Sequence, residues 1–277
     1  MKIGNREFDT KHHTYVMGIL NVTPDSFSDG GNYDQIDAAL FHAEQMKKDG
    51  ADLIDVGGES TRPGHTQISD QEEISRVVPV IERIKKEIDL PISVDTYKSG
   101  VAKAAIDAGA DLINDIWGLK YDTNLAKVIA ETEVACCLMH NRTLPEGTEE
   151  TGTDAGKLMQ EVMADLRETL RLAKEAGIRD EKIMLDPGVG FGKTCEMNLQ
   201  VMHELAQFQT LGYPVLLGTS RKSMIGLTLN VPVDQREEGT LVTTVMAVQT
   251  GCGFVRVHDV LKNKRAIQMT EAIRDAV

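Results

Sequence analysis

Hydrophobic residues along the chain gather in short runs, and each run is followed by a longer stretch in which they recur at helical spacing. Eight runs have the length of a strand: YVMGILN, ADLIDVG, PISVD, DLINDI, VACCLMH, KIMLDPG, PVLLGTS and GFVRVH. The helical patterns include Gln35–Lys48, Gln71–Ile88, Gly100–Ala108, Leu158–Ala176, Met197–Phe208, Gly239–Gln249 and a last one from about Val260 to Ala276. Continuous apolar runs are typical of strands buried on both faces, so the pattern predicts a parallel sheet covered by helices.

One unit of this pattern repeats almost letter for letter. GADLID at Gly50–Asp55 returns as GADLIND at Gly109–Asp115, and more loosely as GCGFVRVH at Gly251–His258. The glycine suits the end of a helix, and the apolar letters form the strand that follows. Eight strand–helix units predict an α/β fold, a (β/α)8 TIM barrel, with a doubly wound open sheet as the alternative.

The chain length agrees with one barrel. α/β barrels of about 250 residues form a single domain, so residues 1–277 are predicted to be one domain. The first 14 residues precede the first predicted strand, and we expect this short N-terminal segment to close the bottom of the barrel.

Composition and charge narrow the class of partner. The formal net charge of −13 argues against nucleic acid and anionic membranes as partners. The longest apolar runs have about six residues, far short of the roughly 20 that span a bilayer, and the N-terminus lacks an apolar signal core. We therefore expect a cytoplasmic protein. The four cysteines form no C-x-x-C pair, so they are expected to be small buried hydrophobic residues.

Polar residues stand where the predicted strands end, which is where barrel enzymes hold their active sites. In chain order they are Asn21, Asp55, Asp95, Asn114, Asp115, Asp186, Lys222, Arg256 and His258. Asp and Asn at such positions often cap the next helix, but several of these residues lie within or directly against the apolar runs. A ring of buried carboxylates and amides needs N–H donors, so we expect a polar ligand that carries several of them.

The charges of this ring follow the order of the strands. The carboxylates come from the early and middle strands, whereas Lys222, Arg256 and His258 come from the last two. Phosphate sites in this fold commonly form near the loops after strands seven and eight, and arginine can clamp a phosphate through two N–H groups. The sequence thus predicts an anionic group at that side and a donor-rich group beside the aspartates.

Three loops combine glycine with reactive side chains. Asn21–Tyr33 and Gly57–Gln67 mix Gly and Pro with Ser, Thr, Asp or Glu, and they are interpreted as lids over the site. LDPGVGFGKT, Leu185–Thr194, ends like a nucleotide phosphate loop, but Pro187 stands where the opening glycine belongs. Because this stretch follows the sixth strand of a barrel, we do not expect a nucleotide there, and Asp186 is its informative residue.

Seven motifs, in order along nearly the whole chain, closely resemble those of the dihydropteroate synthase family. They are NVTPDSFSDGG, GGESTRPG, SVDT, LINDI, DPGVGFGKT, GTSRKS and VRVHDV. That family condenses 6-hydroxymethyl-7,8-dihydropterin pyrophosphate with p-aminobenzoate, which gives 7,8-dihydropteroate and pyrophosphate in folate biosynthesis. Sulfonamides compete for its aminobenzoate site. The resemblance implies that this chain is such a transferase and, by analogy, a homodimer.

The resemblance also implies a pterin pocket. Its residues would be Asp95, Asn114, Ile116, Met139, Asp186, Phe191, Gly218 and Lys222. A carboxylate can accept hydrogen bonds from both the 2-amino group and the adjacent ring N–H of a pterin. Ile116 and Met139 would equally suit a plain barrel core. The residues implied in catalysis are Asp95, Lys222 and Arg256.

The resemblance also implies which residues contact the pyrophosphate and the p-aminobenzoate. Pyrophosphate would lie with Asn21, Arg256 and His258, and Mg²⁺ would bind Asn21, phosphate oxygens and water. The p-aminobenzoate would contact Phe27, Thr61, Arg62, Pro63, Lys222 and Ser223. The bond to pyrophosphate would break early, and the aspartates would stabilise the positive charge on the pterin methylene. No covalent enzyme intermediate is expected.

Three other functions remain alternatives at this point. A pterin-binding methyltransferase that uses methyltetrahydrofolate shares a similar pocket but has no use for Asn21–Gly31, Thr61–Gly64 and Lys222–Ser223. A non-catalytic pterin-binding paralogue would be expected to lose a lid or strand-end residue. A Schiff-base aldolase needs its lysine on a strand, whereas Lys222 lies beyond the seventh.

Overall fold

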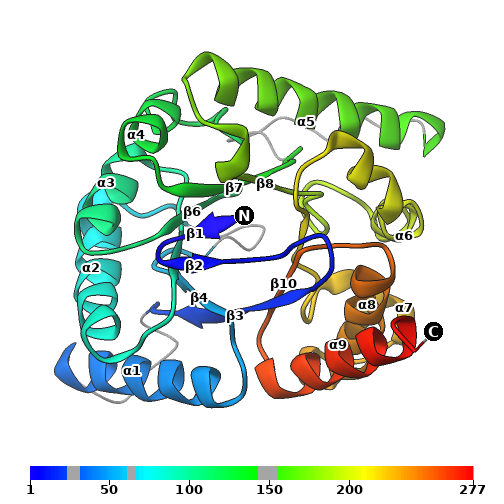
Figure 1. The fold of residues 1–277 in the computed structure, drawn as a ribbon, viewed down its shortest axis with the longest axis horizontal. Coiled ribbons are helices and arrows are strands. Elements are labelled where there is room, and N and C mark those ends of the chain that lie inside the picture. The colour runs from blue at the N-terminus through cyan, green and yellow to red at the C-terminus, as the bar shows by residue number, and fades with distance from the viewer. Residues whose placement is uncertain (24–31, 61–65, 143–154, 277) are drawn as a thin grey trace.

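The computed structural model describes residues 1–23, 32–60, 66–142 and 155–276, and its main feature is a closed parallel sheet. The strand order is β8-β7-β6-β5-β4-β3-β10-β9. A bridge joins Leu185 of β8 to Val215, the residue before β9, so the sheet closes into a barrel (Figure 1). The barrel prediction is confirmed and the open-sheet alternative is wrong. The strands are β3 Tyr15–Asn21, β4 Leu53–Gly57, β5 Ile92–Asp95, β6 Leu112–Asp115, β7 Ala135–Met139, β8 Ile183–Asp186, β9 Leu216–Leu217 and β10 Phe254–Val257.

Helices surround this barrel, as Figure 1 shows. They are α1 Asn32–Lys48, α2 Asp70–Glu87, α3 Ser99–Asp107, α4 Leu125–Thr132, α5 Leu158–Glu175, α6 Cys195–His203, α7 Ser223–Leu229, α8 Glu237–Gln249 and α9 Val260–Arg274. The predicted helix Met197–Phe208 is divided, because α6 ends at His203 and the chain continues as a 3-10 helix over Leu205–Leu211. The helical patterns named from the sequence did not include α4 and α7, which have only 8 and 7 residues.

Side chains of the strands alternate between two cores, as the period of two in a strand requires. Residues such as Ile54, Val94 and Leu138 belong to a large apolar cluster that also contains the buried faces of the helices. The other face of the strands points into the barrel, where a separate apolar layer fills one end. Its strand residues are Met17, Leu53, Leu112, Ala135, Cys137, Met184, Leu216 and Phe254.

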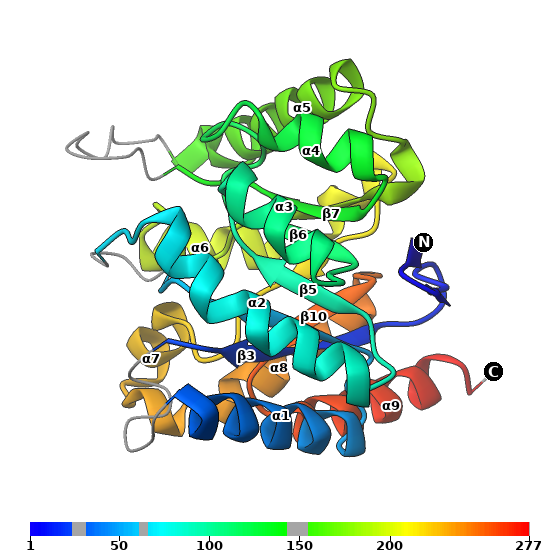
Figure 2. The same cartoon turned by 90° about the vertical axis from the view of Figure 1, so that its left-hand side faces the viewer.

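The N-terminal segment closes this apolar end of the barrel. β1 Lys2–Ile3 and β2 Arg6–Glu7 pair as an antiparallel hairpin, which lies at one end of the molecule, opposite α7 (Figure 2). Ile3 and Phe8 are buried in the apolar layer, and the ring centroids of Phe8 and Phe254 are 5.4 Å apart. Among the described residues, side chains therefore fill this end of the barrel. The carboxyl ends of the strands lie at the opposite end, which is the end where a ligand is expected.

The prediction that the cysteines are buried holds for three of the four. Cys136, Cys137 and Cys252 are buried as free thiols, but Cys195 is half-exposed at the start of α6, so the prediction of a buried residue is wrong there. Among the described helices, none is long and apolar enough to cross a membrane.

Candidate active site

The polar residues of the predicted ring reach the inside of the barrel through the strand period. Asp55 lies two residues after Leu53 of the apolar layer, and Asn114 lies two residues after Leu112. Because residues two apart share a face of a strand, these polar side chains form the next layer inward, toward the carboxyl ends of the strands. Both are buried, as are Asp95 and Asp186.

Three of these side chains form one ionic group, here called the arginine cluster: Asp55, Asp95 and Arg256. Arg256 donates through Nε to Asp55 Oδ2 at 2.6 Å and through NH2 to Asp95 Oδ2 at 2.8 Å. Asp55 also accepts a hydrogen bond of 2.5 Å from the hydroxyl of Ser93. Both oxygens of Asp55 are thus bound by the protein itself.

The arginine cluster overturns the predicted separation of charges. Arg256 comes from the last strand, yet it pairs with carboxylates of the second and third strands of the barrel. The strand order is the reason, because β10 pairs directly with β3, the neighbour of β4, and its inward side chains therefore lie close to those of the early strands. Burial lowers the pKa of Arg256, but the two carboxylates more than compensate and hold it above its ordinary value.

Asp95 differs from Asp55 in having a free oxygen. Asp95 Oδ1 is buried and has no hydrogen-bond partner in the described part of the chain. Burial raises the pKa of Asp95 to about 7, and the neighbouring Arg256 offsets this only in part. A buried acceptor without a donor costs free energy, so this oxygen is suited to an N–H group of a ligand.

Asn21 lies close to the same carboxylate. A β-carbon built on Gly57 would be 3.5 Å from Asn21 Oδ1 and 3.7 Å from Asp95 Cβ. Gly57 therefore keeps the space between the two side chains open. Asn21 itself is exposed at the end of β3.

Asp186 forms a second acceptor at the mouth. Its Oδ1 accepts a hydrogen bond of 2.7 Å from the backbone N–H of Gly188, and burial raises its pKa to about 6. Its Oδ2 faces Gly218, where an added β-carbon would lie only 3.5 Å away. The absence of a side chain at Gly218 leaves the way to this oxygen open.

Lys222 supplies a cation beside these acceptors. Its Nζ lies 4.0 Å from the centroid of the Phe191 ring, a cation–π distance. Burial lowers its pKa to about 8. Within the described residues Nζ makes no hydrogen bond, so its donors are available to a ligand.

An apolar wall completes the mouth. Ile116, Met139 and Tyr97 form a small buried cluster, and Trp117 and Phe191 pack against it. The structure thus brings together the predicted wall residues with two aromatic residues that the sequence did not single out. Tyr97 directly follows the SVDT motif and Trp117 follows Ile116, so proximity to a motif was the signal that could have found them.

Asp115 does not belong to the ring. It follows Asn114 directly, so its side chain lies on the other face of β6. Its oxygens accept hydrogen bonds from the backbone N–H groups of Trp117 at 2.8 Å and Leu119 at 2.6 Å. Asp115 therefore stabilises the turn after β6, and its prediction as part of the ligand-binding ring is wrong.

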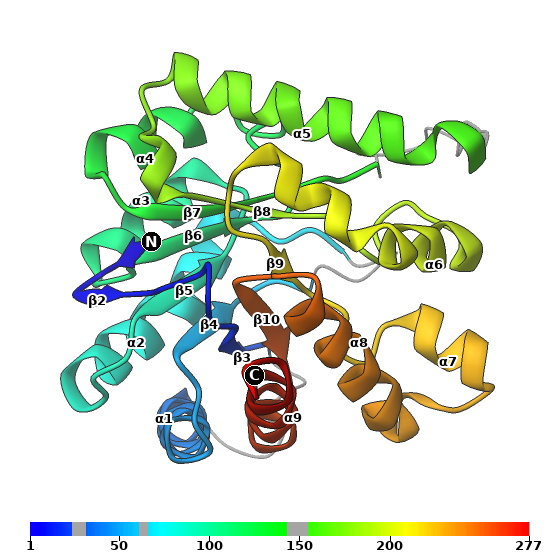
Figure 3. The same cartoon turned by 45° about the vertical axis from the view of Figure 1, so that its right-hand side comes forward.

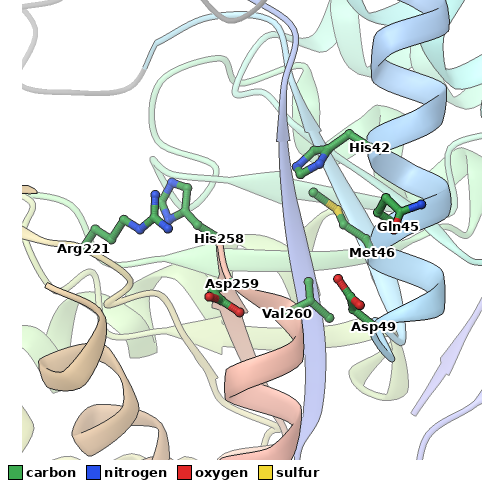
Figure 4. A pocket seen from close by; sticks show the side chains of 8 residues that line it. All are labelled: His42, Gln45, Met46, Asp49, Arg221, His258, Asp259 and Val260. Atoms are coloured by element: carbon green, nitrogen blue, oxygen red, sulfur yellow. The ribbon is translucent and has the colours of Figure 1, made fainter. Parts of the chain in front are cut away.

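His258 lies at the rim, beside a cavity outside the barrel. Its Nδ1 is 2.9 Å from the hydroxyl of Ser220. A cavity of about 270 Å³ lies between α1 and the start of α9 (Figure 4). Arg221 and His258, which follow β9 and β10 in the chain, both line this cavity, as Figure 4 shows. The lining residues are His42, Gln45, Met46, Asp49, Arg221, His258, Asp259 and Val260.

Of the residues predicted to contact aminobenzoate, only Lys222 and Ser223 lie among the described residues. Phe27, Thr61, Arg62 and Pro63 lie outside the described residues. Ser223 is exposed at the first position of α7, next to Lys222. The contact predicted for these residues stays a prediction.

A second buried ionic group, here called the lysine cluster, consists of Glu59, Glu73 and Lys98. Lys98 Nζ donates to Glu59 Oε2 at 2.6 Å, to Glu73 Oε2 at 2.8 Å and to the carbonyl of Ile68 at 2.7 Å. The hydroxyl of Tyr97 donates to Glu59 Oε1 at 2.6 Å. This cluster joins the end of β4, α2 and the loop after β5 next to the apolar wall.

Comparisons with known proteins agree with this geometry. Residues 17–258 match the family of pterin binding enzymes. The chain is 57% identical over 274 residues to the dihydropteroate synthase of Clostridium beijerinckii, with 99% of each chain covered.

Solved structures of this kind have the same fold. The dihydropteroate synthase of Clostridium difficile, determined in the presence of pteroic acid, aligns with a TM-score of 0.90 and 49% identity, over 96% of this chain and 99% of that one. The Yersinia pestis enzyme in complex with a sulfonamide drug aligns with a TM-score of 0.90 and 42% identity, over 100% and 99% of the chains. The chain belongs to the pterin-binding enzyme family and, within it, to the dihydropteroate synthases, which are transferases of folate biosynthesis.

Proposed function

We propose that the barrel mouth joins 6-hydroxymethyl-7,8-dihydropterin pyrophosphate to p-aminobenzoate, with the residues of the mouth in the roles that follow. Family membership supports the reaction. One observation supports the location above all others: Asp95 Oδ1 is a buried carboxylate oxygen that has no donor in the described chain. The methyltransferase, paralogue and aldolase alternatives have no comparable support.

Three acceptors would hold the pterin ring. Asp95 Oδ1 and Asp186 Oδ2 carry no hydrogen bond from the described residues, and a pterin offers an amino group and ring N–H groups. Asn114 donates to Asp55 at 3.4 Å, which leaves its carbonyl oxygen for the ligand. Lys222, whose pKa is lowered to about 8, would donate to the carbonyl and ring-nitrogen side of the pterin. Ile116, Met139 and Phe191 would form the apolar walls, with Gly218 allowing close approach.

The pyrophosphate would leave from the rim between Asn21, Arg256 and His258. Arg256 uses Nε and NH2 for the two aspartates, so NH1 remains for an anion. The bond between the methylene carbon and the pyrophosphate oxygen breaks, and the electron pair leaves with pyrophosphate. Asp95 and Asp186 stabilise the positive charge that remains on the pterin. The neutral amine of p-aminobenzoate then attacks the methylene carbon, and the nitrogen gives its proton to the released pyrophosphate.

Mg²⁺ would be held at this site mainly by the substrate. Among the described residues, no group of three His, Cys, Asp or Glu side chains is placed to hold a metal. Asn21 offers one neutral oxygen of the hard type that Mg²⁺ prefers, and it lies at the rim near Asp95. When bound, the ion would neutralise negative charge on the pyrophosphate. Asn21 would be its protein ligand.

Release of pyrophosphate tests the proposed reaction. The protein is mixed with the pterin pyrophosphate, Mg²⁺ and p-aminobenzoate, and we expect release that depends on p-aminobenzoate and is inhibited competitively by a sulfonamide. Lys222→Ala should lower both turnover and pterin affinity. Lys174→Ala is the matched control, because Lys174 is exposed on α5. Near-normal kinetics of Lys222→Ala would contradict the pocket assignment.

We also propose a homodimer that forms through α7 and α8. Four large apolar side chains are exposed on these helices and the segment between them: Leu227, Leu229, Val233 and Val242. Figure 3 shows the two helices side by side on one flank of the barrel. Leu227 is 68% exposed, and burial of such a surface stabilises association. In sedimentation experiments Leu227→Glu should be monomeric. Phe41→Glu on α1, a position that is 63% exposed, is the control and should not change the assembly. The cytoplasmic location stays a prediction from the sequence.

A further inference from the structure

The glycine-rich turn after β8 is bound by the lysine that made it look like a phosphate loop. Lys193 Nζ donates to the backbone carbonyls of Gly188 at 2.8 Å and Phe191 at 3.2 Å. The next residue, Thr194, is the N-cap of α6 and accepts a hydrogen bond from the N–H of Met197. Both polar side chains at the end of the motif are therefore used by the turn and the helix.

A second buried side chain holds the same turn. Asn198 of α6 is 2% exposed. Its Oδ1 accepts a hydrogen bond of 2.7 Å from the N–H of Gly190, and its Nδ2 donates to the carbonyl of Lys193 at 3.1 Å. Gly188, Gly190 and Gly192 all have positive φ values, between 56° and 87°. Glycines have little local preference for one conformation, so the side chains of Lys193 and Asn198 determine the shape of the turn.

The glycine-rich turn contacts or supplies three parts of the proposed pterin pocket: Asp186, the Phe191 ring and Lys222. The N–H of Gly188 binds Asp186 Oδ1 at 2.7 Å. The Phe191 ring packs against the apolar wall and lies under Lys222 Nζ at 4.0 Å. A β-carbon on Gly190 would be only 2.8 Å from Lys222 Cδ, so the turn also fits closely against the lysine stem.

Burial of the Lys193 ammonium group costs free energy, which an apolar side chain at this position would avoid. Burial lowers the pKa of Lys193 to about 7, and its hydrogen bonds go to neutral carbonyls rather than to a carboxylate. An apolar side chain, however, could not hold two carbonyls in one place.

We propose that Lys193 is a positioning residue of the pterin site, which acts through the Gly188–Phe191 turn on Asp186 and Lys222 without contacting the pyrophosphate. This inference rests on the proposed function for the identity of the ligand. The rival role is direct binding of a phosphate, as in a nucleotide loop. In that role Lys193 would affect only ligands that carry the pyrophosphate.

Two ligands separate the roles. Lys193→Met keeps the length of the side chain and removes its donors. Isothermal titration with 6-hydroxymethylpterin and with its pyrophosphate should show that both affinities fall by the same factor, about tenfold. In steady state the KM for the pterin pyrophosphate should rise while kcat stays within about threefold. Lys174→Met on α5 is the matched control and should change neither quantity.

Trp117 provides a second measurement that needs no ligand. It is the single tryptophan of the chain, and it packs against the same apolar cluster as Phe191. If the turn moves in Lys193→Met, the emission spectrum of the folded, ligand-free protein should change, whereas that of Lys174→Met should not. Lys193→Gln, which keeps an N–H donor, should lie between wild type and Lys193→Met in pterin affinity and in emission, and it serves if the methionine variant does not fold.

Two outcomes would overturn the proposal. Loss of affinity for the pyrophosphate ligand alone would show a direct phosphate contact, and unchanged affinity for both ligands would show that the turn does not need the lysine. Wild-type protein that binds the pterin but releases no pyrophosphate with p-aminobenzoate would instead contradict the proposed function. The binding comparison would still decide the role of Lys193.

Discussion

The barrel contains two buried ionic clusters that are alike in composition and differ in one respect. The arginine cluster and the lysine cluster each hold one cation between two carboxylates. The side chains of Asp55 and Asp95 are 0% and 5% exposed, and those of Glu59 and Glu73 are 3% and 1% exposed. In the lysine cluster no buried polar atom lacks a partner among the described residues, whereas Asp95 Oδ1 in the arginine cluster does.

The difference separates a structural cluster from one prepared for a ligand. Lys98 also donates to the carbonyl of Ile68, and Glu59 also accepts from Tyr97, so the lysine cluster joins several segments of the fold. Burial lowers the pKa of Lys98, but its two glutamates raise it above the ordinary value. Burial raises the pKa of a carboxyl group in both clusters, that of Glu73 and that of Asp95, which reaches about 7. What distinguishes Asp95 is therefore its buried oxygen, which has no donor in the described part of the chain. The incomplete cluster is the one at the mouth of the barrel.

The largest effect should follow from breaking the complete cluster. Lys98→Met leaves two buried carboxylates without their cation, and removal of one partner of a buried pair destabilises by about 3–5 kcal/mol. Denaturant unfolding monitored by circular dichroism should show this loss. The double variant Lys98→Met/Glu73→Gln should recover part of the loss because one uncompensated charge is removed. A single variant as stable as wild type would contradict the structural role.

The incomplete cluster should respond in function rather than in stability. Asp95→Asn replaces the free carboxylate oxygen by a neutral group, and a hydrogen bond to a charged group contributes about 1.5–3 kcal/mol. We therefore expect pterin affinity to fall by roughly tenfold to hundredfold, measured by isothermal titration, with the unfolding midpoint at pH 8 unchanged or raised. Asp107→Asn, exposed on α3, is the control. Pterin affinity equal to wild type would remove Asp95 from the pocket.

The pH dependence of stability should distinguish wild type from Asp95→Asn in the ligand-free state. The folded pKa of Asp95, about 7, is above the ordinary value of 3.8. The folded protein therefore binds more protons than the unfolded chain between these values, and stability falls as pH rises toward 7. For one group the slope reaches about 1.4 kcal/mol per pH unit. Denaturant titrations from pH 5 to pH 7 should show this extra slope in wild type; equal slopes in both proteins would refute it.

The smallest change in stability is expected for an exposed ion pair, which serves as a reference for the two buried clusters. Lys103 and Asp107 form an ion pair of 3.3 Å on α3, and their side chains are 65% and 66% exposed. Because solvent screens such a pair, Lys103→Ala should leave the unfolding midpoint within the error of the measurement. A loss comparable to that of Lys98→Met would mean that burial is not what distinguishes the ion pairs of this protein.

Much of the fold and part of the site could be predicted from the sequence. The strand–helix alternation predicted the barrel, and the strand period carries Asp55 and Asn114 inward from Leu53 and Leu112. The same period applied to Asp115 would have placed it on the other face of its strand. The error there came from treating every polar residue at a strand end as part of one ring.

Other features depended on contacts between distant segments. Arg256 was predicted apart from the aspartates because phosphate sites in this fold commonly lie near the loops after the last two strands. It is 201 residues from Asp55 in the sequence, and the pairing of β10 with β3 brings the two together. No pattern in the sequence indicated the lysine cluster. None indicated the contact of Lys193 with its own turn either, because a lysine beside a glycine-rich stretch suits a phosphate equally well.

The sequence by itself determined the order of the elements, the faces of the strands and the residue types available at the barrel mouth. Those properties are local, because a strand alternates its side chains whatever its neighbours are. Only the tertiary structure decided which buried polar atoms have partners and which do not. Hydrogen bonds and ion pairs are satisfied across the barrel, between residues far apart in the chain, so the free oxygen of Asp95 becomes visible only when all the neighbouring strands are in place.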